Sequence, residues 1–254
     1  MTSHVQSDLV ARLAAIDSTV PPTEGKAQLD ALLAEARAAG DRLAVGAIAT
    51  SLAKHFASMG DWPPCRDMLA LASAELSGFE APIEHARLAV ARSWLFDAEV
   101  DVPALEHALP ILEACGLWVD ASACARELAF AARTAGRPET ARPLYLRAIG
   151  AAEATGQRLG VASLVRALAD LETSAGAPAR ADALLRGALM RLAPVMLLGA
   201  RRAEALCIES LGDAHLAQER PADARRCYEE AIERLDRIEA GGVARVKKKL
   251  ERIP

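Results

Sequence analysis

Aromatic residues are scarce in this chain and make up only 4% of its 254 residues. β-Branched residues are also few, and these are the two groups that β-strands favour. Alanine, leucine, arginine and glutamate dominate instead, and all four are strong helix formers. Hydrophobic residues account for 52% and charged residues for 25%, which argues against a disordered chain. The composition therefore predicts an all-α globular protein.

A basic excess and a long apolar run are both missing. The formal net charge is −4, so we expect no general attraction to nucleic acid or to anionic membranes. The longest uncharged apolar stretch, Leu43–Ala53, is much shorter than the ~20 residues of a membrane span. The five cysteines lack a framework spacing, and the first ten residues do not read as a signal peptide. These features predict a cytoplasmic protein whose partner is neither nucleic acid nor a membrane.

Motifs that would indicate an enzyme are also missing. The chain has no glycine-rich phosphate loop, no GxGxxG and no GxSxG. Its five histidines never pair at metal-ligand spacing, and Cys115 and Cys124 have no histidine nearby to complete a zinc site. Cys65 and Cys227 fall at helix-packing positions, where cysteine serves as a small apolar residue. We therefore predict a non-catalytic protein without cofactor or metal.

What the sequence does contain is a regular alternation of glycine and proline. Glycines recur about every 40 residues, and one proline-marked turn lies in each interval. Proline favours the first turn of a helix, and glycine permits the left-handed residue that follows its end. Each unit should therefore hold two helices, the second beginning at proline and ending at glycine. The glycines are Gly40, Gly78, Gly116, Gly156, Gly199 and Gly241, and the prolines are Pro22, Pro63, Pro103, Pro138, Pro178 and Pro221.

One spacing of small and large residues recurs in four of these units. Leucine is followed by a small residue, by another small residue at thirteen, by leucine or an aromatic residue at seventeen, and by alanine at twenty. The sets are Leu52, Ala53, Cys65, Leu69 and Ala72; Leu128, Ala129, Ala141, Tyr145 and Ala148; Leu168, Ala169, Ala181, Leu185 and Ala188; and Leu211, Gly212, Ala224, Tyr228 and Ala231. This pattern, over roughly residues 41–240, resembles the tetratricopeptide repeat family in a long-period bacterial variant.

The resemblance implies a right-handed α-solenoid of about five to six stacked antiparallel helix pairs with a C-terminal capping helix. A single helix pair would leave apolar surface exposed on both flanks, so the pairs must stack. We expect one domain over residues 1–254, with units over 1–40, 41–79, 80–117, 118–157, 158–198 and 199–240 and a cap over 241–254. The units over 1–40 and 80–117 are degenerate, and in the latter Arg92 stands where the family has leucine.

The resemblance also implies that the first helix of each pair lines a concave groove. Arg126, Phe130 and Arg133 are spaced four and three residues apart, which places them on one helix face. Guanidinium groups beside aromatic surface suit a carboxylate or a phosphate attached to an apolar group. The family's own carboxylate clamp uses asparagine, which this chain lacks entirely. The predicted groove residues are Arg87, Trp94, Arg126, Phe130, Arg133, Arg166 and Asp170, with Thr50 and Lys54 in an earlier unit and Glu209 and Asp213 in the last.

Several interpretations stay open at this point. The leading one is a scaffold that binds a protein or peptide segment, and the alternative is a regulator that senses a ligand or signalling peptide and acts through a partner. The arginine face could also be an ordinary solvated surface, because arginine far outnumbers lysine in this chain. Leu189–Gly199 reads either as core between two units or as a surface for self-association into a homo-oligomer or for a partner. Lys247–Lys249 reads as the solvated side of the cap, with a contact to an acidic partner as the alternative.

Overall fold

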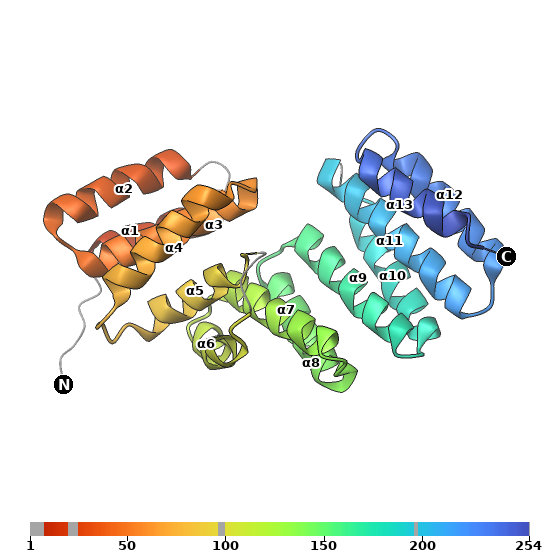
Figure 1. Cartoon of the computed structure of the whole chain (residues 1–254), viewed down its shortest axis with the longest axis horizontal. Helices are drawn as coiled ribbons and strands as arrows, with labels where there is room; N and C mark the ends of the chain where they lie inside the picture. Colours follow the sequence, from red (N-terminus) through yellow and green to blue (C-terminus); the bar gives the residue numbers. More distant parts are fainter. Residues whose placement is uncertain (1–7, 20–24, 96–99, 196–197, 254) are drawn as a thin grey trace. The chain divides into compact units, whose positions relative to one another are not determined.

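The structure, a computed structural model, describes residues 8–19, 25–95, 100–195 and 198–253. These residues form thirteen α-helices and no strand (Figure 1), which confirms the predicted all-α class. The helices are α1 (Asp8–Thr19), α2 (Lys26–Ala39), α3 (Arg42–Met59), α4 (Trp62–Leu76), α5 (Pro82–Arg92), α6 (Val102–Ala114), α7 (Trp118–Thr134), α8 (Pro138–Ala154), α9 (Arg158–Ser174), α10 (Pro178–Leu192), α11 (Leu198–Ala217), α12 (Pro221–Leu235) and α13 (Ala240–Leu250).

The chain divides into two compact units, Met1–Asp120 (unit 1) and Ala121–Pro254 (unit 2). In unit 1, α3 packs against α1, α2, α4 and α5, and α5 packs against α6. In unit 2, α9 packs against α8, α10 and α11, while α12 packs against α11 and α13. Contacts therefore run between consecutive helices and between neighbouring pairs, as in a helical-repeat stack. The predicted α-solenoid of helix pairs with a final capping helix is confirmed.

Proline marks the start of the second helix in five of the pairs, whereas α2 begins at Lys26 without a proline in its first turn. Pro63, Pro103, Pro138, Pro178 and Pro221 occupy the first or second position of α4, α6, α8, α10 and α12. A proline at these positions costs no backbone hydrogen bond, because the amide groups of the first turn have no acceptor within the helix. The predicted role of proline is confirmed at these five positions, and Pro22 lies outside the described residues.

Glycine follows the second helix in four units but not in the last two. Gly40, Gly78, Gly116 and Gly156 adopt φ between 67° and 86°, as predicted. The prediction was wrong for Gly199 and Gly241, which lie inside α11 and α13. The chain leaves α10 and α12 through Ala193 (φ −46°) and Asp236 (φ −50°), and this right-handed backbone needs no glycine. The positive φ values of Gly60, Gly136 and Gly176, which end first helices, were not predicted.

All four sets of repeat-pattern residues are buried, so the pattern marks the core. Its small residues allow helices to approach closely, and its large residues fill the space beside them. Gly212 shows this best: a Cβ atom built on it would lie 2.5 Å from Cε1 of Tyr228, a side chain that is itself fully buried. Gly46 is similar, because a Cβ atom there would lie 2.6 Å from Cγ of Leu76.

Gly46→Ala and Gly212→Ala should each lower the free energy of unfolding by about 1–3 kcal/mol, because Leu76 and Tyr228 have no room to move. Gly150→Ala in α8 and Gly187→Ala in α10 are matched controls, since no atom lies within 4 Å of the added methyl group. These two should instead raise stability by roughly 0.5–1 kcal/mol through helix propensity. Urea denaturation followed by circular dichroism measures all four, and equal effects at the four sites would contradict the packing described.

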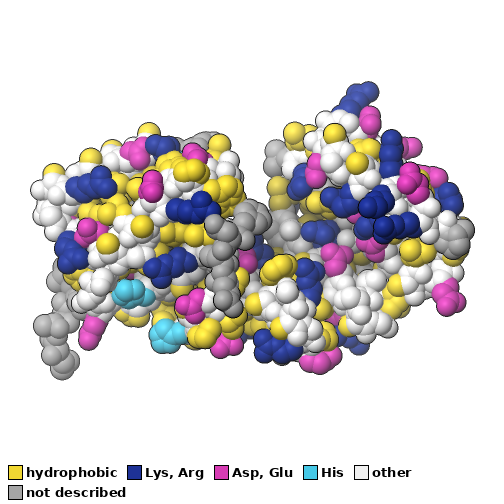
Figure 2. Space-filling model, in the orientation of Figure 1, with side chains coloured by type: hydrophobic (Ala, Val, Ile, Leu, Met, Phe, Trp, Pro, Cys, Tyr) yellow, Lys and Arg dark blue, Asp and Glu magenta, His cyan; other side chains and the backbone are white. Residues whose placement is uncertain are grey.

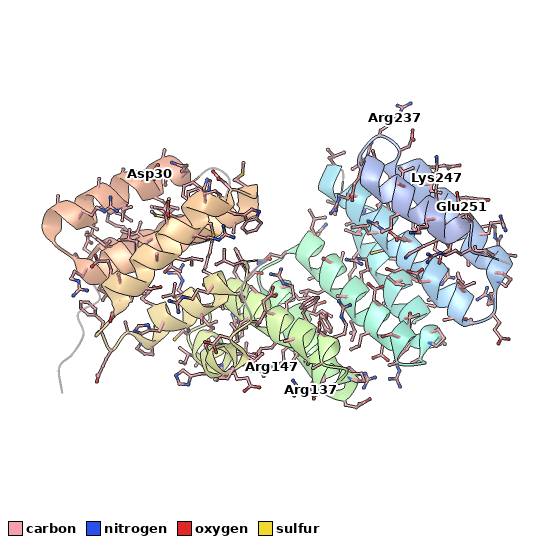
Figure 3. The ribbon with its side chains drawn as sticks, in the orientation of Figure 1. Asp30, Arg137, Arg147, Arg237, Lys247 and Glu251 are labelled. Atoms are coloured by element: carbon pink, nitrogen blue, oxygen red, sulfur yellow. The ribbon has the colours of Figure 1, made fainter. Side chains whose placement is uncertain are left out.

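The final helix covers the end of unit 2. Val246 and Ile253 are buried and pack in one cluster with Tyr228 and Leu235 of α12. Lys247 lies on the exposed side of α13 (Figure 3), as expected for a solvated face. Lys249 differs, because its amine forms ion pairs with Glu209 and Asp213 of α11. The cap is therefore held by apolar contacts and by charge.

The junction Leu189–Gly199 is only partly core. Leu192 is fully buried and Leu189 packs at the edge of the last cluster, whereas Met190 and Leu198 are strongly exposed. Met196 and Leu197 lie outside the described residues. The oligomer interpretation of this segment stays a prediction.

Candidate functional site

Arg87, the first of the predicted groove residues, lies inside unit 1 and not on its surface. Its side chain is only 9% exposed, and it bonds to acidic residues from three helices. One terminal nitrogen donates to Asp17 of α1, and Nε donates to Oδ2 of Asp120 at 3.1 Å. The other terminal nitrogen lies 3.5 Å from Oε2 of Glu84. The guanidinium is therefore fully occupied within the unit, which differs from the groove role predicted for it.

Lys54 and Asp120 extend this network, which we call the unit 1 charge cluster (Asp17, Ser51, Lys54, Glu84, Arg87 and Asp120). The Lys54 amine donates to Asp120, and the Ser51 hydroxyl donates to Oδ2 of Asp17 at 2.9 Å. Burial alone would raise the pKa of the Asp120 carboxyl, but Lys54 and Arg87 outweigh it and hold that pKa below its usual value. Burial lowers the pKa of Lys54 despite the attraction of Asp120. The cluster joins α1, α3 and α5 to the start of α7.

Trp94 is the other predicted groove residue of unit 1. It lies in the turn after α5, because α5 ends at Arg92, and its ring is half-buried. The indole Nε1 is buried without a hydrogen-bond acceptor among the described residues. Trp94 therefore offers little open aromatic surface.

The three predicted residues of α7 do lie at the surface of unit 2. Phe130 is 46% exposed, so a large part of its apolar side chain is open to solvent. The Arg133 guanidinium lies over its ring, 5.3 Å from the ring centroid. Arg126 is exposed and pairs with its neighbour Glu127 at 2.7 Å. The spacing of four and three residues thus places Arg126, Phe130 and Arg133 on one accessible face, as predicted.

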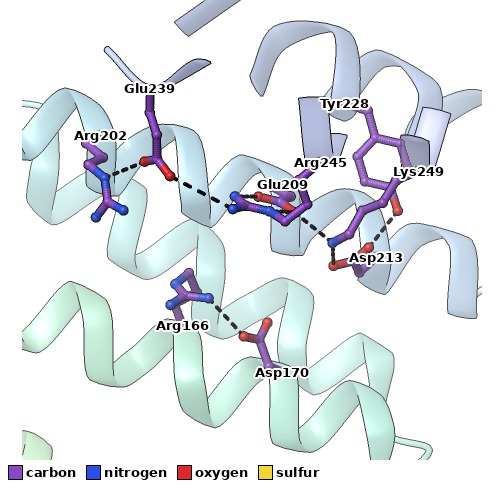
Figure 4. A network of polar contacts seen from close by, with 9 residues as sticks. All are labelled: Arg166, Asp170, Arg202, Glu209, Asp213, Tyr228, Glu239, Arg245 and Lys249. Atoms are coloured by element: carbon purple, nitrogen blue, oxygen red, sulfur yellow. Dashed lines mark hydrogen bonds and ion pairs between the residues drawn. The ribbon is translucent and has the colours of Figure 1, made fainter. Parts of the chain in front are cut away.

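The two predicted residues of α9 bond to each other. Nη1 of Arg166 lies 3.1 Å from Oδ2 of Asp170, and both side chains are partly buried (Figure 4). Burial raises the pKa of the Asp170 carboxyl above its usual value, although a hydrogen bond from Ser210 and the charges of Arg166 and Arg133 act in the opposite direction. Asp170 is thus a partly buried carboxylate that pairs with Arg166, and the charge of Arg133 on α7 acts on it only from beyond ion-pair distance.

The acidic residues predicted at the end of the groove are neutralised by the cap. Arg245 donates to Glu209 at 2.6 Å, and Lys249 bonds to both Glu209, at 2.9 Å, and Asp213, at 2.6 Å (Figure 4). Asp213 also accepts from the Tyr228 hydroxyl at 2.6 Å. Burial would raise the pKa of Glu209, but its bonds to Arg245 and Lys249 bring it below its usual value. Sequence reasoning missed these two cations, although their spacing of four residues indicates one helix face.

Charge balance singles out Arg133 among the predicted residues. In unit 2, Arg126, Arg166 and Asp170 each pair with an opposite charge, whereas Arg133 has no carboxylate within ion-pair distance in the described part of the chain. Figure 2 shows acidic and basic side chains interspersed over the visible face of each unit. An anion would therefore meet Arg133 and Phe130 together, with apolar and cationic surface side by side.

Two further observations concern the described residues alone. They contain no group of three or more histidine, cysteine, aspartate or glutamate side chains that could hold a metal ion. None of their helices combines the length and apolar character needed to cross a membrane.

Comparison with known proteins shows likeness at the level of fold. BtubC (BKLC) from P. vanneervenii matches with a TM-score of 0.64 and 18% identity, over 92% of this chain and 94% of that chain. A signal transduction ATPase with numerous domains and a tetratricopeptide repeat sensor, from Pyrococcus horikoshii, matches with a TM-score of 0.66 and 14% identity. That match covers 95% of this chain but only 37% of the longer protein.

A Rap protein complexed with Competence and Sporulation Factor also matches, with a TM-score of 0.54 and 12% identity over 96% of this chain and 83% of that chain. No family model and no curated protein matches the sequence. The chain therefore has the helical-repeat fold of tetratricopeptide proteins, as the four repeat-pattern sets predicted.

Proposed function

We propose that this protein is a non-catalytic scaffold that binds a protein or peptide segment on one face of unit 2. This α7–α9 face consists of Arg126, Phe130 and Arg133 of α7 and Arg166 of α9. The observation that carries the proposal is the exposed ring of Phe130 beneath an Arg133 guanidinium that lacks a carboxylate partner in the described chain. Almost half of the surface of Phe130 remains open to water in the protein alone. A partner that covers it would remove apolar area from water, which is favourable by about 25 cal/mol per Å².

The chemistry of these residues favours a partner that carries a carboxylate next to an apolar side chain. Arginine binds carboxylates through two parallel N–H donors, and aromatic and arginine residues dominate the energy of protein interfaces. Arg133 would receive the carboxylate while Phe130 contacts the apolar neighbour. Arg126 lies one helical turn before Phe130 on α7, and Arg166 lies on α9, the first helix of the following pair. Both arginines could therefore bind further acidic residues of a longer partner segment. The likeness to a Rap protein complexed with a factor is compatible with this role.

Display of a random peptide library tests the proposal, followed by anisotropy measurements on the selected peptides. Phe130→Ala and Arg133→Ala should each weaken binding at least tenfold, or about 1.4 kcal/mol, because each removes one half of the anchor. Arg225→Ala is the matched control: Arg225 is an exposed arginine on a second helix, α12, and its loss should leave affinity unchanged. Selected peptides that bind all three variants equally would contradict the proposal.

Asp170→Asn should act in the opposite direction and strengthen binding of an acidic peptide by severalfold. The Asp170 carboxylate competes within the chain for the Arg166 guanidinium and opposes the approach of a second anion. Because burial raises the pKa of Asp170, removing its charge should not destabilise unit 2 at neutral pH. Weaker binding by Asp170→Asn, with thermal stability unchanged, would place the acidic residues of the partner elsewhere.

A further inference from the structure

Unit 1 holds a cavity of about 440 Å³ between α4, α5 and α6. Cavities of roughly 300–1,000 Å³ are the size that small-molecule sites have in proteins. Its lining is mixed: six of the eleven residues are apolar and five are polar or charged. The lining residues are Leu69, Ala70, Ser73, His85, Leu88, Ala89, Arg92, Ser93, Leu95, Asp101 and Ala104.

The cavity lies where the repeat pattern fails. Arg92 takes the place of the pattern leucine, and α5 ends there, whereas α3, α7, α9 and α11 continue for six or seven residues beyond that leucine. Leu105 and Leu112 occupy the positions at thirteen and twenty, which are small in the other pairs. The pair α5–α6 therefore departs from the pattern at three of its five positions. A charged residue replaces an apolar one directly beside the cavity.

Arg92 brings a positive charge to the lining that nothing in the described chain neutralises. It is exposed, and its one partner there is a neutral group, the Ser73 hydroxyl. Charge-assisted bonds from a guanidinium to a carboxylate are about twice as strong as bonds between neutral groups. A ligand carboxylate would therefore displace Ser73 from Arg92 with a gain in free energy.

Asp101 brings the opposite charge to the same lining. Its Oδ1 accepts from the backbone N–H of Ala104 at 3.1 Å and so caps α6, but no cation pairs with this carboxylate in the described part of the chain. His85, the other titratable group of the lining, is engaged at Nε2 with the carbonyl of Phe79 at 3.0 Å. Arg92 and Asp101 line one cavity without forming an ion pair with each other, so each can receive a charge of a ligand.

We propose that this cavity binds a free α-amino acid with an apolar side chain. The ligand carboxylate would meet Arg92, its ammonium group would meet Asp101, and its side chain would lie against the lining residues Leu69, Leu88 and Leu95. A simple carboxylate leaves Asp101 unpaired, and a simple amine leaves Arg92 unpaired, so the zwitterion matches both charges. The site belongs to unit 1 and is independent of the peptide face proposed on unit 2.

Isothermal titration calorimetry with three probes tests this assignment: L-phenylalanine, 3-phenylpropanoate, which lacks the ammonium group, and phenethylamine, which lacks the carboxylate. L-Phenylalanine should bind saturably and at least tenfold more tightly than either analogue. Arg92→Gln should remove that advantage over phenethylamine, and Asp101→Asn should remove the advantage over 3-phenylpropanoate. Asparagine caps a helix as well as aspartate, so Asp101→Asn keeps α6 intact.

Arg37→Gln, an exposed arginine on α2 of the same unit, is the matched control and should bind L-phenylalanine like the unmodified protein. Ala89→Phe fills the cavity from α5 and should abolish binding of all three probes, with circular dichroism showing that the helices remain. The assignment is overturned if L-phenylalanine shows no saturable binding. It is also overturned if Arg92→Gln and Asp101→Asn leave the order of the three probes unchanged.

Discussion

Replacing Arg87 with methionine should lower the free energy of unfolding of unit 1 by about 3–5 kcal/mol. Methionine keeps the packing of the long side chain but leaves Asp17, Glu84 and Asp120 without their shared cation. The loss should appear in urea denaturation as an earlier transition of unit 1. Arg186→Met is the control, because its pair with Asp182 is exposed and such pairs contribute about 0–1 kcal/mol.

The same cluster predicts a pH dependence. The folded-state pKa of Asp120 lies below that of the unfolded chain, so the carboxylate contributes stability above its ordinary pKa of about 4. That contribution is lost as the pH falls through the folded-state value. The difference in stability between the unmodified protein and Arg87→Met should therefore shrink as the pH falls below about 4. A loss smaller than 1 kcal/mol at pH 7 would show that the cluster does not hold α1, α3 and α5 together.

The double substitution Arg245→Met and Lys249→Met should destabilise unit 2 by about 2–3 kcal/mol. The Glu209 side chain is only 7% exposed and would lose both of its cations, and leaving a buried charge unpaired is costly. The expected loss is smaller than at Arg87, because the cations of the cap are partly exposed and solvent would reach the gap. Lys247→Met changes an exposed lysine of the same helix and should have almost no effect. Urea denaturation measures both variants.

Adding Glu209→Met to the double variant should restore much of the lost stability. Replacing every member of a buried ion pair with apolar residues is often neutral, whereas removing one partner is not. Since the pKa of Glu209 is lowered in the folded protein, the double variant should differ least from the unmodified protein below about pH 4. If the triple variant is no more stable than the double variant, the cap is held by its apolar contacts alone.

Local residues predict most of this fold. Pro138 and Pro178 begin second helices because their missing amide donors and fixed φ suit a first turn, and Gly116 and Gly156 end them because they adopt positive φ. These effects act within a few residues and are therefore readable from sequence. Gly199 shows where this sequence-based prediction fails. Sequence alone does not distinguish a glycine inside a helix from a glycine that follows one, because this depends on where the preceding turn ends.

The candidate site was less predictable, because partners far apart in sequence decide which charges are free. Helical spacing placed Phe130 and Arg133 on one face correctly, since that depends on their own helix alone. The same spacing argument placed Arg87 in the groove, but its guanidinium donates hydrogen bonds to Asp17 and Asp120, which lie 70 and 33 residues away in the sequence. The Lys247–Lys249 run read as a solvated surface, but Lys249 bonds to α11.

Photo-crosslinking tests the binding role of the α7–α9 face most directly. Benzoylphenylalanine would be placed at position 130 on α7 or, as the comparison, at position 225 on α12, and each protein would be irradiated with a selected acidic peptide. We predict a covalent adduct from position 130 that is absent from position 225 and is suppressed by excess unlabelled peptide. Adducts that form equally at both positions, or at position 225 alone, would contradict a binding site built on Phe130 and Arg133.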